Sequence, residues 1–158
     1  MELKQQEYFM QEALKEAKKA FDLGEVPIGC VLVVDGKIIG RGHNLRETSN
    51  DATSHAEIQA IRQANQALQS WRLNGAKLFV TLEPCPMCSG AILNARIAEV
   101  YYGAYDLKAG TAGTLLNLLA DRRFNHQCLV TKGVCYQECQ ALLQNFFGAI
   151  RQKNNEKD

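Results

Sequence analysis

The chain has 158 residues, a length typical of one domain with a single hydrophobic core. Its 46% hydrophobic and 22% charged residues are typical of a soluble globular protein, which excludes disordered and fibrous classes. The net charge of +1 gives no electrostatic indication of nucleic-acid or membrane binding, so either function must be inferred from particular residues.

The chain carries no predicted membrane span or export signal. Its longest uninterrupted aliphatic run is 30–34, far below the ~20 residues that cross a bilayer. The N-terminal segment MELKQQEYFMQEALK is polar and amphipathic and lacks the apolar core of a signal peptide. We therefore expect a cytoplasmic protein without membrane contact, whose six cysteines are thiols or metal ligands rather than a disulfide framework.

The first part of the chain predicts a helix followed by a hairpin. Apolar side chains at helical spacing predict a helix over 6–23, and Gly24 is a typical stop signal. A buried-looking strand over 28–34 follows. The dipeptide Asp35-Gly36 then predicts a tight hairpin turn into a second strand over 37–40.

The middle of the chain predicts alternating helices and strands. A polar loop over 44–53 leads to a second helix over 56–68, and residues 77–82 predict a strand that runs directly into two cysteines. A helix over 89–95 and a strand over 100–105 come next. The order strand, helix, strand predicts parallel pairing with helices on the faces of the sheet.

The last part of the chain predicts a glycine-rich loop at 110–114, a short leucine-rich helix, a strand near 128–134 and a final helix from Gln137. The chain has no repeat and no linker, so we expect one domain over 1–158 of the α/β class. The polar tail over 152–158 is expected to fray.

Two cysteines, Cys85 and Cys88, lie in TLEPCPMCSG, where a predicted strand meets a predicted helix. A C-x-x-C pair at a helix N-terminus is also typical of thioredoxin-like redox proteins, because the helix dipole stabilises a thiolate. Thioredoxin-like folds bring a downstream cis-proline against the pair, and this chain has no proline after Pro86. The sequence therefore favours a metal site over a redox pair.

Two ligand sets compete to complete that metal site. Cys135 and Cys139 could close a four-thiolate structural zinc site. Their i, i+4 spacing and the usual burial of cysteine instead favour core positions, as for Cys30 and Cys128. The other candidate ligand is His55, about thirty residues upstream of the cysteine pair in SHAEIQA. H-A-E followed by P-C-x-x-C matches the signature of zinc-dependent nucleobase deaminases.

The chemistry explains these residue types. His55, Cys85 and Cys88 would leave the fourth position of a tetrahedral zinc ion to water, which is the arrangement of a catalytic site. An unligated carboxylate must then move protons, and Glu57 is the candidate. Ser54 to Glu57 also fits a helix capping box, in which Glu57 would have only a structural role. Residues two apart on a helix point in different directions, so His55 and Glu57 can share a pocket only if the helix begins there.

These motifs identify a family resemblance that extends from Tyr8 to Arg151. The chain closely resembles the bacterial tRNA-specific adenosine deaminases, the TadA family of the cytidine-deaminase-like superfamily. The segments that carry the resemblance are EVPIGCVLV (25–33), HAEIQAIRQ (55–63), TLEPCPMCSGAI (81–92), GAYDLKAGTAG (103–113) and ECQALLQNFF (138–147).

The resemblance implies a three-layer α/β/α fold with a central five-stranded mixed sheet, and a homodimer. It implies zinc-dependent hydrolytic deamination of adenosine to inosine at the wobble position of a tRNA anticodon stem-loop, in bacteria mainly of an arginine tRNA. One zinc ion per chain would be held by His55, Cys85 and Cys88, with Glu57 as the proton shuttle. No organic cofactor is implied.

The resemblance also implies a set of substrate contacts. Asn44 resembles the asparagine that contacts the flipped base, and from the sequence alone it would be a turn residue. Asp106 and Lys108 match a region that contacts flanking nucleotides, although Asp106 alone would be a loop cap. The full predicted substrate-binding set is Asn44, Val26, Ile28, Pro84, Asp106, Lys108 and Phe147. The departures from the family pattern are Tyr105, Cys135 and Tyr136.

RNA binding has the weakest support among the residues themselves. Two segments, Arg122-Arg123 and Phe146-Phe147…Arg151…Lys153, could stack on and neutralise a nucleic acid. The residues themselves favour the simpler interpretation, in which Phe146 or Phe147 is a core residue and the charges form a solvated face. Two alternative functions stay open: an RNA-binding module with a structural zinc and no turnover, and deamination of free guanine or cytidine.

Overall fold

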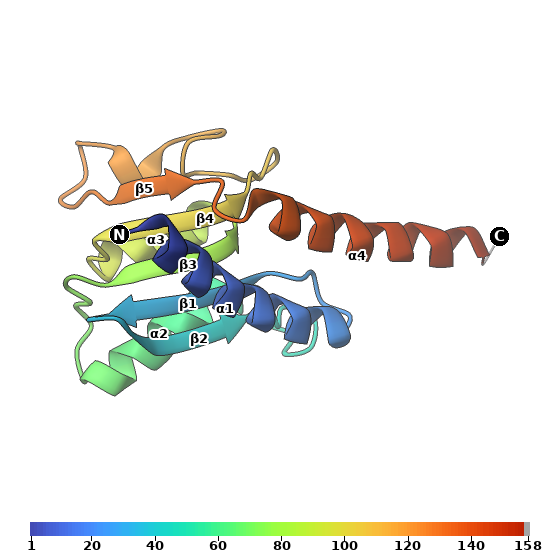
Figure 1. The fold of residues 1–158 in the computed structure, drawn as a ribbon, viewed down its shortest axis with the longest axis horizontal. Helices are drawn as coiled ribbons and strands as arrows, with labels where there is room; N and C mark the ends of the chain where they lie inside the picture. Colours follow the sequence, from blue (N-terminus) through green and yellow to red (C-terminus); the bar gives the residue numbers. More distant parts are fainter. Residues whose placement is uncertain (157–158) are drawn as a thin grey trace.

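A five-stranded mixed sheet forms the centre of the molecule in the computed structural model, which describes residues 1–156 (Figure 1). The sheet order is β2-β1-β3-β4-β5. β1 pairs antiparallel with both β2 and β3, whereas β3, β4 and β5 are parallel. The strands are β1 (Gly29–Val34), β2 (Lys37–His43), β3 (Lys77–Leu82), β4 (Glu99–Ala104) and β5 (Leu129–Lys132).

Helices cover both faces of this sheet. The helices are α1 (Leu3–Asp22), α2 (Ala56–Leu68), α3 (Pro86–Asn94), the 3₁₀ turn η1 (Leu118–Ala120) and α4 (Tyr136–Glu156). Alternate residues of β1 divide the core: Leu32 packs in the cluster that contains α2 and α3, and Val31 packs in the cluster that contains α1 and the start of α4. In Figure 1, α1 accordingly lies in front of the sheet and α2 behind it. The predicted three-layer α/β/α fold is confirmed.

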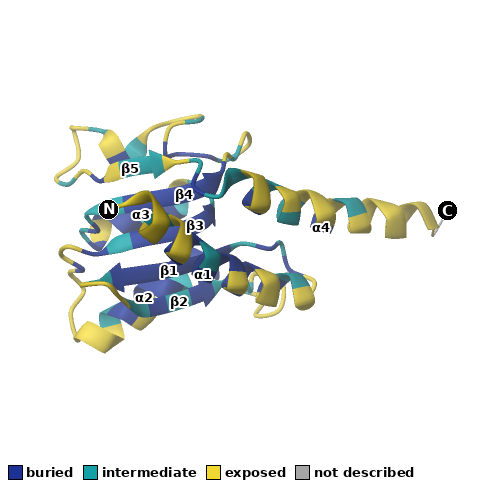
Figure 2. Cartoon of the chain, viewed as in Figure 1, coloured by how far each residue is buried: buried dark blue, intermediate teal, exposed yellow. Residues whose placement is uncertain are grey.

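The burial pattern follows these layers (Figure 2). The inner strands are buried, whereas α4 extends past the edge of the sheet and buries only Cys139 and Phe146. Among the described residues, no helix combines the length and apolarity that a membrane span requires.

The predicted hairpin between β1 and β2 is confirmed. Val34 pairs with Lys37, so Asp35 and Gly36 alone form the turn. Both turn residues have positive φ, 50° and 76°, which is the requirement of a type I′ turn and the reason that Asp-Gly favours it.

Several predicted bounds differ from those in the structure: α1 begins at Leu3 rather than at 6, β2 continues to His43 rather than ending at 40, and two later helices differ more. α3 begins at Pro86 rather than at 89, because proline at the first helical position needs no N–H partner and Cys85 takes the N-cap position. The leucine-rich helix is a single 3₁₀ turn at Leu118–Ala120. The predicted fraying of 152–158 falls partly on the last turns of α4 and partly outside the described residues, and it stays a prediction.

Glycines in β2 allow α2 to lie directly on the sheet. A Cβ atom at Gly42 would collide with the carbonyl oxygen of Ala56 and would lie 2.6 Å from Cβ of Gln59. Gly40 likewise faces the carbonyl of Ala60 without space for a side chain. The backbone of β2 therefore fixes the position of α2 and of its N-terminal residue.

Candidate active site

A histidine and two cysteines meet at the N-termini of α2 and α3. His55 and Cys85 occupy the N-cap positions of these two helices, and Cys88 follows in the first turn of α3. His55 Nδ1 lies 3.6 Å from Cys85 Sγ and 3.5 Å from Cys88 Sγ. All three potential ligand atoms lie within 4.8 Å of one another.

This triangle has the dimensions of a zinc site. With Zn–S bonds of about 2.3 Å and Zn–N bonds of about 2.05 Å, tetrahedral coordination puts a nitrogen and a sulfur ligand about 3.6 Å apart. The two observed nitrogen–sulfur distances, 3.6 and 3.5 Å, agree with that value. One histidine and two thiols are also a donor set that zinc prefers. The residues therefore fit a tetrahedral metal ion with one position left for a non-protein ligand.

The three groups already influence one another electrostatically. A hydrogen bond from the Cys88 thiol lowers the pKa of Cys85 to about 4, and the hydrogen bond to His55 acts in the same direction. That interaction with Cys85 raises the pKa of His55. The pKa of Cys88 is raised because its proton is shared with Cys85 and because it is buried. At least one thiolate is thus available to a cation at neutral pH.

Glu57 is buried beside this cluster without belonging to it. Its residue is 4% exposed, and burial raises the pKa of its carboxyl to about 7. Among residues 1–156, the potential metal-binding group contains His55, Cys85 and Cys88 but not Glu57. α2 begins directly after His55, which meets the geometric condition under which His55 and Glu57 can serve one site.

The capping box that would give Glu57 a purely structural role does not form. His55, not Ser54, is the N-cap residue of α2, and no N-cap side chain bonds to the helix. The Ser54 hydroxyl instead accepts a hydrogen bond from the Gln59 amide at 2.5 Å. Glu57 is therefore a buried carboxylate without a capping function.

A cavity of about 570 Å³ opens onto the metal-binding triangle. Its size suits a nucleobase with part of its sugar. Its walls come from the loop before β1, the loop after β2, the start of α2, the ends of β3 and β4, and one face of α4. The lining residues are Val26, Ile28, Asn44, Arg46, His55, Ala56, Leu82, Cys85, Tyr105, Asp106, Leu107, Lys108, Ala109, Leu143 and Phe147.

The comparison with known proteins is decisive for the family. The profile of the MafB19-like deaminase family matches residues 4–151. A tRNA-specific adenosine deaminase of Bacillus subtilis (strain 168) is 55% identical over 149 residues, covering 94% of this chain and 92% of that protein. The enzyme of the same name from Streptococcus pyogenes serotype M18 is 54% identical, covering 97% and 98%. This chain belongs to the tRNA-specific adenosine deaminase family.

Solved structures agree with this family assignment. A structure from studies of A-to-I editing by tRNA:A34 deaminases superposes with a TM-score of 0.83 at 46% identity, covering 86% of this chain and 99% of that one. A guanine deaminase from Bacillus subtilis is also similar, with a TM-score of 0.62 at 43% identity over 68% of this chain and 69% of that one. The fold thus serves at least two purine substrates among these relatives.

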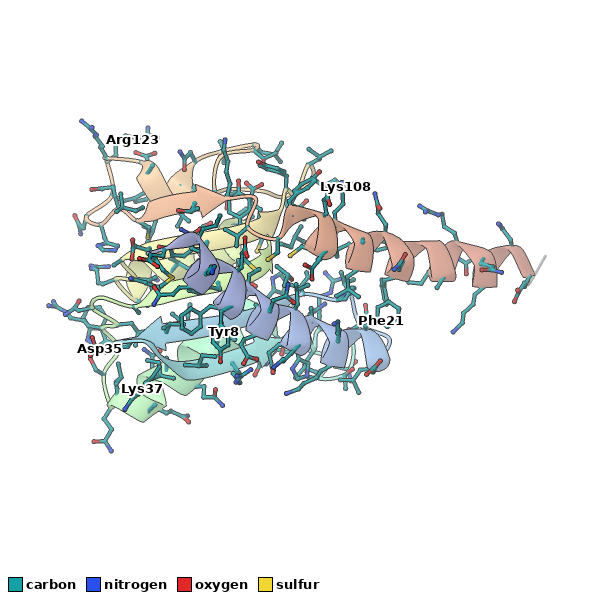
Figure 3. All side chains as sticks on the ribbon, viewed as in Figure 1. Tyr8, Phe21, Asp35, Lys37, Lys108 and Arg123 are labelled. Carbon is teal, nitrogen blue, oxygen red and sulfur yellow. The ribbon has the colours of Figure 1, made fainter. Side chains whose placement is uncertain are left out.

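Most of the predicted substrate contacts of this family member lie on one cavity. Of the seven, all except Pro84 line it. The Pro84 carbonyl instead accepts hydrogen bonds from the backbone and hydroxyl of Thr111. Figure 3 labels Lys108 beside the first turns of α4, at this end of the molecule. Their role as substrate contacts stays a prediction.

Asn44 is fixed by the backbone around it. Its amide N–H donates to the Val26 carbonyl at 3.3 Å, and its amide oxygen accepts from the Arg46 N–H at 3.1 Å. The turn function that the sequence alone suggested is therefore present. One N–H and one lone pair of the amide remain free for a ligand.

Several cavity residues were not predicted from the sequence. Arg46 lies in an irregular polar loop, where no periodicity distinguishes it from its exposed neighbours. Leu143 precedes Phe147 by one helical turn, and this i, i+4 spacing was a signal that could have identified it. Leu107 and Ala109 lie in the loop after β4, and Leu82 is the last residue of β3; the three line one cavity only because the loop folds over the end of the strand.

Other candidate residues lie away from the cavity. Arg123 is at the opposite end of the molecule from Lys108 and forms an ion pair of 2.6 Å with Asp121, which agrees with a solvated charged face (Figure 3). Phe146 is 7% exposed and packs on Phe21 with ring centroids 5.8 Å apart, so it is the core residue of the Phe146-Phe147 pair.

The remaining cysteines contribute no further metal site among residues 1–156. All six cysteines of the chain are free thiols. Cys139, in the first turn of α4, is buried in the core, and Cys30 and Cys128 are buried as well. The core positions expected for Cys30, Cys128 and Cys139 are confirmed. The expectation for Cys135 is wrong: this residue is only partly buried and precedes α4 with a φ of 53°, so it does not share a helix face with Cys139.

Proposed function

We propose that this chain catalyses the hydrolytic deamination of adenosine to inosine at the wobble position of a tRNA anticodon loop. The observation that carries the proposal is the buried carboxylate of Glu57 beside a three-residue candidate metal site, two of whose members, His55 and Cys85, line a cavity of about 570 Å³. The names of the relatives and of the similar structure support the choice of adenosine in tRNA.

His55, Cys85 and Cys88 would hold one zinc ion through Nδ1 and two sulfur atoms. When bound, zinc would supply a nucleophile at neutral pH by lowering the pKa of a water molecule. The N-cap positions of His55 and Cys85 fix these ligands at the starts of two helices, so the protein holds them without a mobile loop.

Glu57 would carry the protons of the reaction. The attacking water gives a proton to the Glu57 carboxylate while its oxygen bonds to C6 of adenine, and Glu57 passes that proton to N1. The second proton of the added hydroxyl then leaves with the exocyclic amine as ammonia, so adenosine and water yield inosine and ammonia. A carboxyl with a pKa of about 7 suits this exchange, because it can both accept and donate near neutral pH.

The cavity would receive a base that has left its stack. A group buried at a cavity floor cannot reach C6 within a duplex, so the target must be single-stranded and splayed out. Val26 and Ile28 offer apolar surface to the base and Asn44 a free N–H and lone pair. Lys108 and Phe147 at the rim would contact the flanking nucleotides by charge and stacking.

The decisive experiment is incubation of the zinc-loaded protein with a short anticodon stem-loop of an arginine tRNA that carries adenosine at the wobble position. Nucleoside analysis should detect inosine, and a scrambled loop should remain unchanged. Free guanine and cytidine serve as competing substrates. Turnover of guanine with the stem-loop untouched would refute the proposal in favour of a guanine deaminase, the function named for one similar structure. A zinc-bound protein with no turnover of any substrate would indicate a binding module.

We further propose a homodimer that acts in the cytoplasm, where its tRNA substrate resides. Leu107, Leu115 and Leu116 expose 78%, 54% and 58% of their surface on one loop, which is unusual apolar exposure for a monomer. Light scattering at micromolar concentration would test the dimer. A molar mass equal to that of one chain would contradict it.

A further inference from the structure

Glu83 is a buried acid that the proposed chemistry does not use. Glu83 follows the last residue of β3 and is separated from Cys85 only by Pro84. Its residue is 2% exposed. Among residues 1–156 its carboxylate forms no ion pair, so its partners must be neutral donors.

Every partner of this carboxylate comes from the loop 106–114. Oε1 accepts from the backbone N–H of Asp106 at 3.2 Å and from the Thr114 hydroxyl. Oε2 accepts from the backbone N–H of Ala112 at 3.0 Å and of Thr114 at 3.1 Å. One side chain thus bonds to the beginning and to the end of the same loop.

The loop carries one wall of the cavity. Asp106 to Ala109 are lining residues, and the Asp106 side chain orders them by accepting from the N–H groups of Lys108 at 3.0 Å and Ala109 at 3.1 Å. Leu107 is nevertheless 78% exposed in the single chain, so little packing within the chain holds this segment from outside. Its position therefore depends on the bonds beneath it.

Gly110 shows how closely the loop approaches Glu83. A Cβ atom at this position would lie 2.5 Å from the carboxyl carbon of Glu83 and 2.5 Å from the carbonyl oxygen of Asp106. The loop can close over the carboxylate only because residue 110 has no side chain. Thr111 adds a second attachment through its hydrogen bonds to the Pro84 carbonyl at 2.9 and 3.0 Å.

We propose that Glu83 is a positioning residue that fixes the loop 106–114, and with it the substrate-contacting wall, to the turn that carries Cys85. The loop and the metal-binding turn then form one hydrogen-bonded unit, so the nucleotide is held at a set distance from the reacting groups. This inference rests on the proposed function for its substrate, but its structural part does not.

The test compares Glu83→Gln with wild type and with Glu16→Gln. Glu16 is a matched control because it is also a buried glutamate, 3% exposed, and does not line the cavity. Glutamine at 83 keeps one acceptor oxygen but turns an NH₂ group toward backbone N–H donors. We expect KM for the anticodon stem-loop to rise about tenfold in Glu83→Gln, with kcat changed less than about threefold and zinc content unchanged.

Backbone hydrogen exchange gives a readout independent of activity. Exchange over 106–114 should accelerate at least about tenfold in Glu83→Gln, and exchange in β1 and β3 should not change. Unchanged exchange in this loop, or acceleration throughout the sheet, would overturn the inference. If Glu83→Gln does not fold, Thr114→Val, which removes only the hydroxyl donor, should raise KM and loop exchange by about threefold. A wild-type protein without activity on the stem-loop would refute the proposed function, while the exchange measurements would still decide the role of Glu83.

Discussion

Replacement of Glu57 by glutamine separates proton transfer from every other role of this residue. The substitution keeps the shape of the side chain but removes its charge and its ability to exchange a proton, and replaces one acceptor oxygen by an NH₂ donor. Because Glu57 makes no cap bond and is buried, glutamine should leave α2 in place. Burial raises the pKa of Glu57 because its charged form is costly in the folded protein. A neutral glutamine avoids that cost, so the free energy of unfolding should not fall at pH 7.

The expected loss is large because one carboxyl serves each proton transfer. General acid–base groups contribute roughly 10²–10⁴-fold in rate, or about 2.7–5.4 kcal/mol of activation free energy. We expect kcat to fall at least about a thousandfold, near the upper part of that range, with KM for the stem-loop within about threefold. Formation of inosine over a range of stem-loop concentrations measures the rate and KM. Elemental analysis measures the zinc content, and thermal unfolding measures the stability.

Glu16→Gln is again the matched control, since it changes a buried glutamate that is ion-paired to Lys19 at 2.8 Å outside the cavity. Its kcat should remain within about twofold of wild type. A Glu57→Gln enzyme that binds zinc and turns over near the wild-type rate would refute the proton-transfer role. A variant that loses zinc would instead indicate that Glu57 supports the metal site.

Three further predictions test the rest of the site. Cys88→Ser should release zinc to a chelator that leaves the wild type loaded, because a hydroxyl replaces a buried thiolate ligand; retention of one zinc per chain would contradict the ligand assignment. Asn44→Ala should weaken binding of the cognate stem-loop by about 1–3 kcal/mol and of unrelated RNA much less, since it removes a pocket group and not a phosphate contact; equal losses for both RNAs would exclude Asn44 from the pocket. Glu25→Gln should lower the free energy of unfolding at pH 7. Burial acts to raise the pKa of Glu25, but hydrogen bonds from Thr48 and Glu47 outweigh it and lower the pKa below 4.5. The stabilisation by the charged carboxylate is therefore present above pH 4.5 and is lost as pH falls through the lowered pKa. The difference in the free energy of unfolding between wild type and Glu25→Gln, measured with urea, should therefore be smaller at pH 3 than at pH 7. An equal difference at both pH values would contradict this reasoning.

The cluster of His55, Cys85 and Cys88 could be predicted from sequence because zinc chemistry restricts both the residue types and their local context. A histidine and a C-x-x-C pair each had several interpretations, and only their combination indicated a three-ligand site. The spacing could not show that His55 and Cys85 are both N-cap residues, since helix starts depend on local hydrogen bonds. The start of α3 was placed too late for that reason.

The walls of the cavity were only partly predictable. β3 and α2 were predicted with their observed bounds, Lys77–Leu82 and Ala56–Leu68, because their apolar pattern is strong and polar turns flank them. Arg46 enters the cavity through tertiary packing of a loop that has no periodicity, and Leu82, the last residue of β3, enters it because that loop and α4 fold over the end of the strand. Nothing in the sequence indicated a role for Glu83, which lies between a strand and a cysteine motif. Its four hydrogen-bond donors are more than twenty residues away along the chain.

The glycines of β2 have a consequence for how the enzyme can vary. Because α2 lies directly on the backbone at Gly40 and Gly42, these two positions limit how close the start of α2, with His55 and Glu57, can come to the sheet, in addition to the core side chains between them. Aliphatic residues elsewhere in the core can be exchanged, with a cost in stability, while the two reacting groups keep their place. Alanine at either glycine would instead displace the reacting groups, because its Cβ atom would push α2 away from the sheet. Natural and engineered variation in substrate choice is therefore expected to accumulate in the loops around the cavity. Gly40 and Gly42, in contrast, are expected to tolerate no side chain.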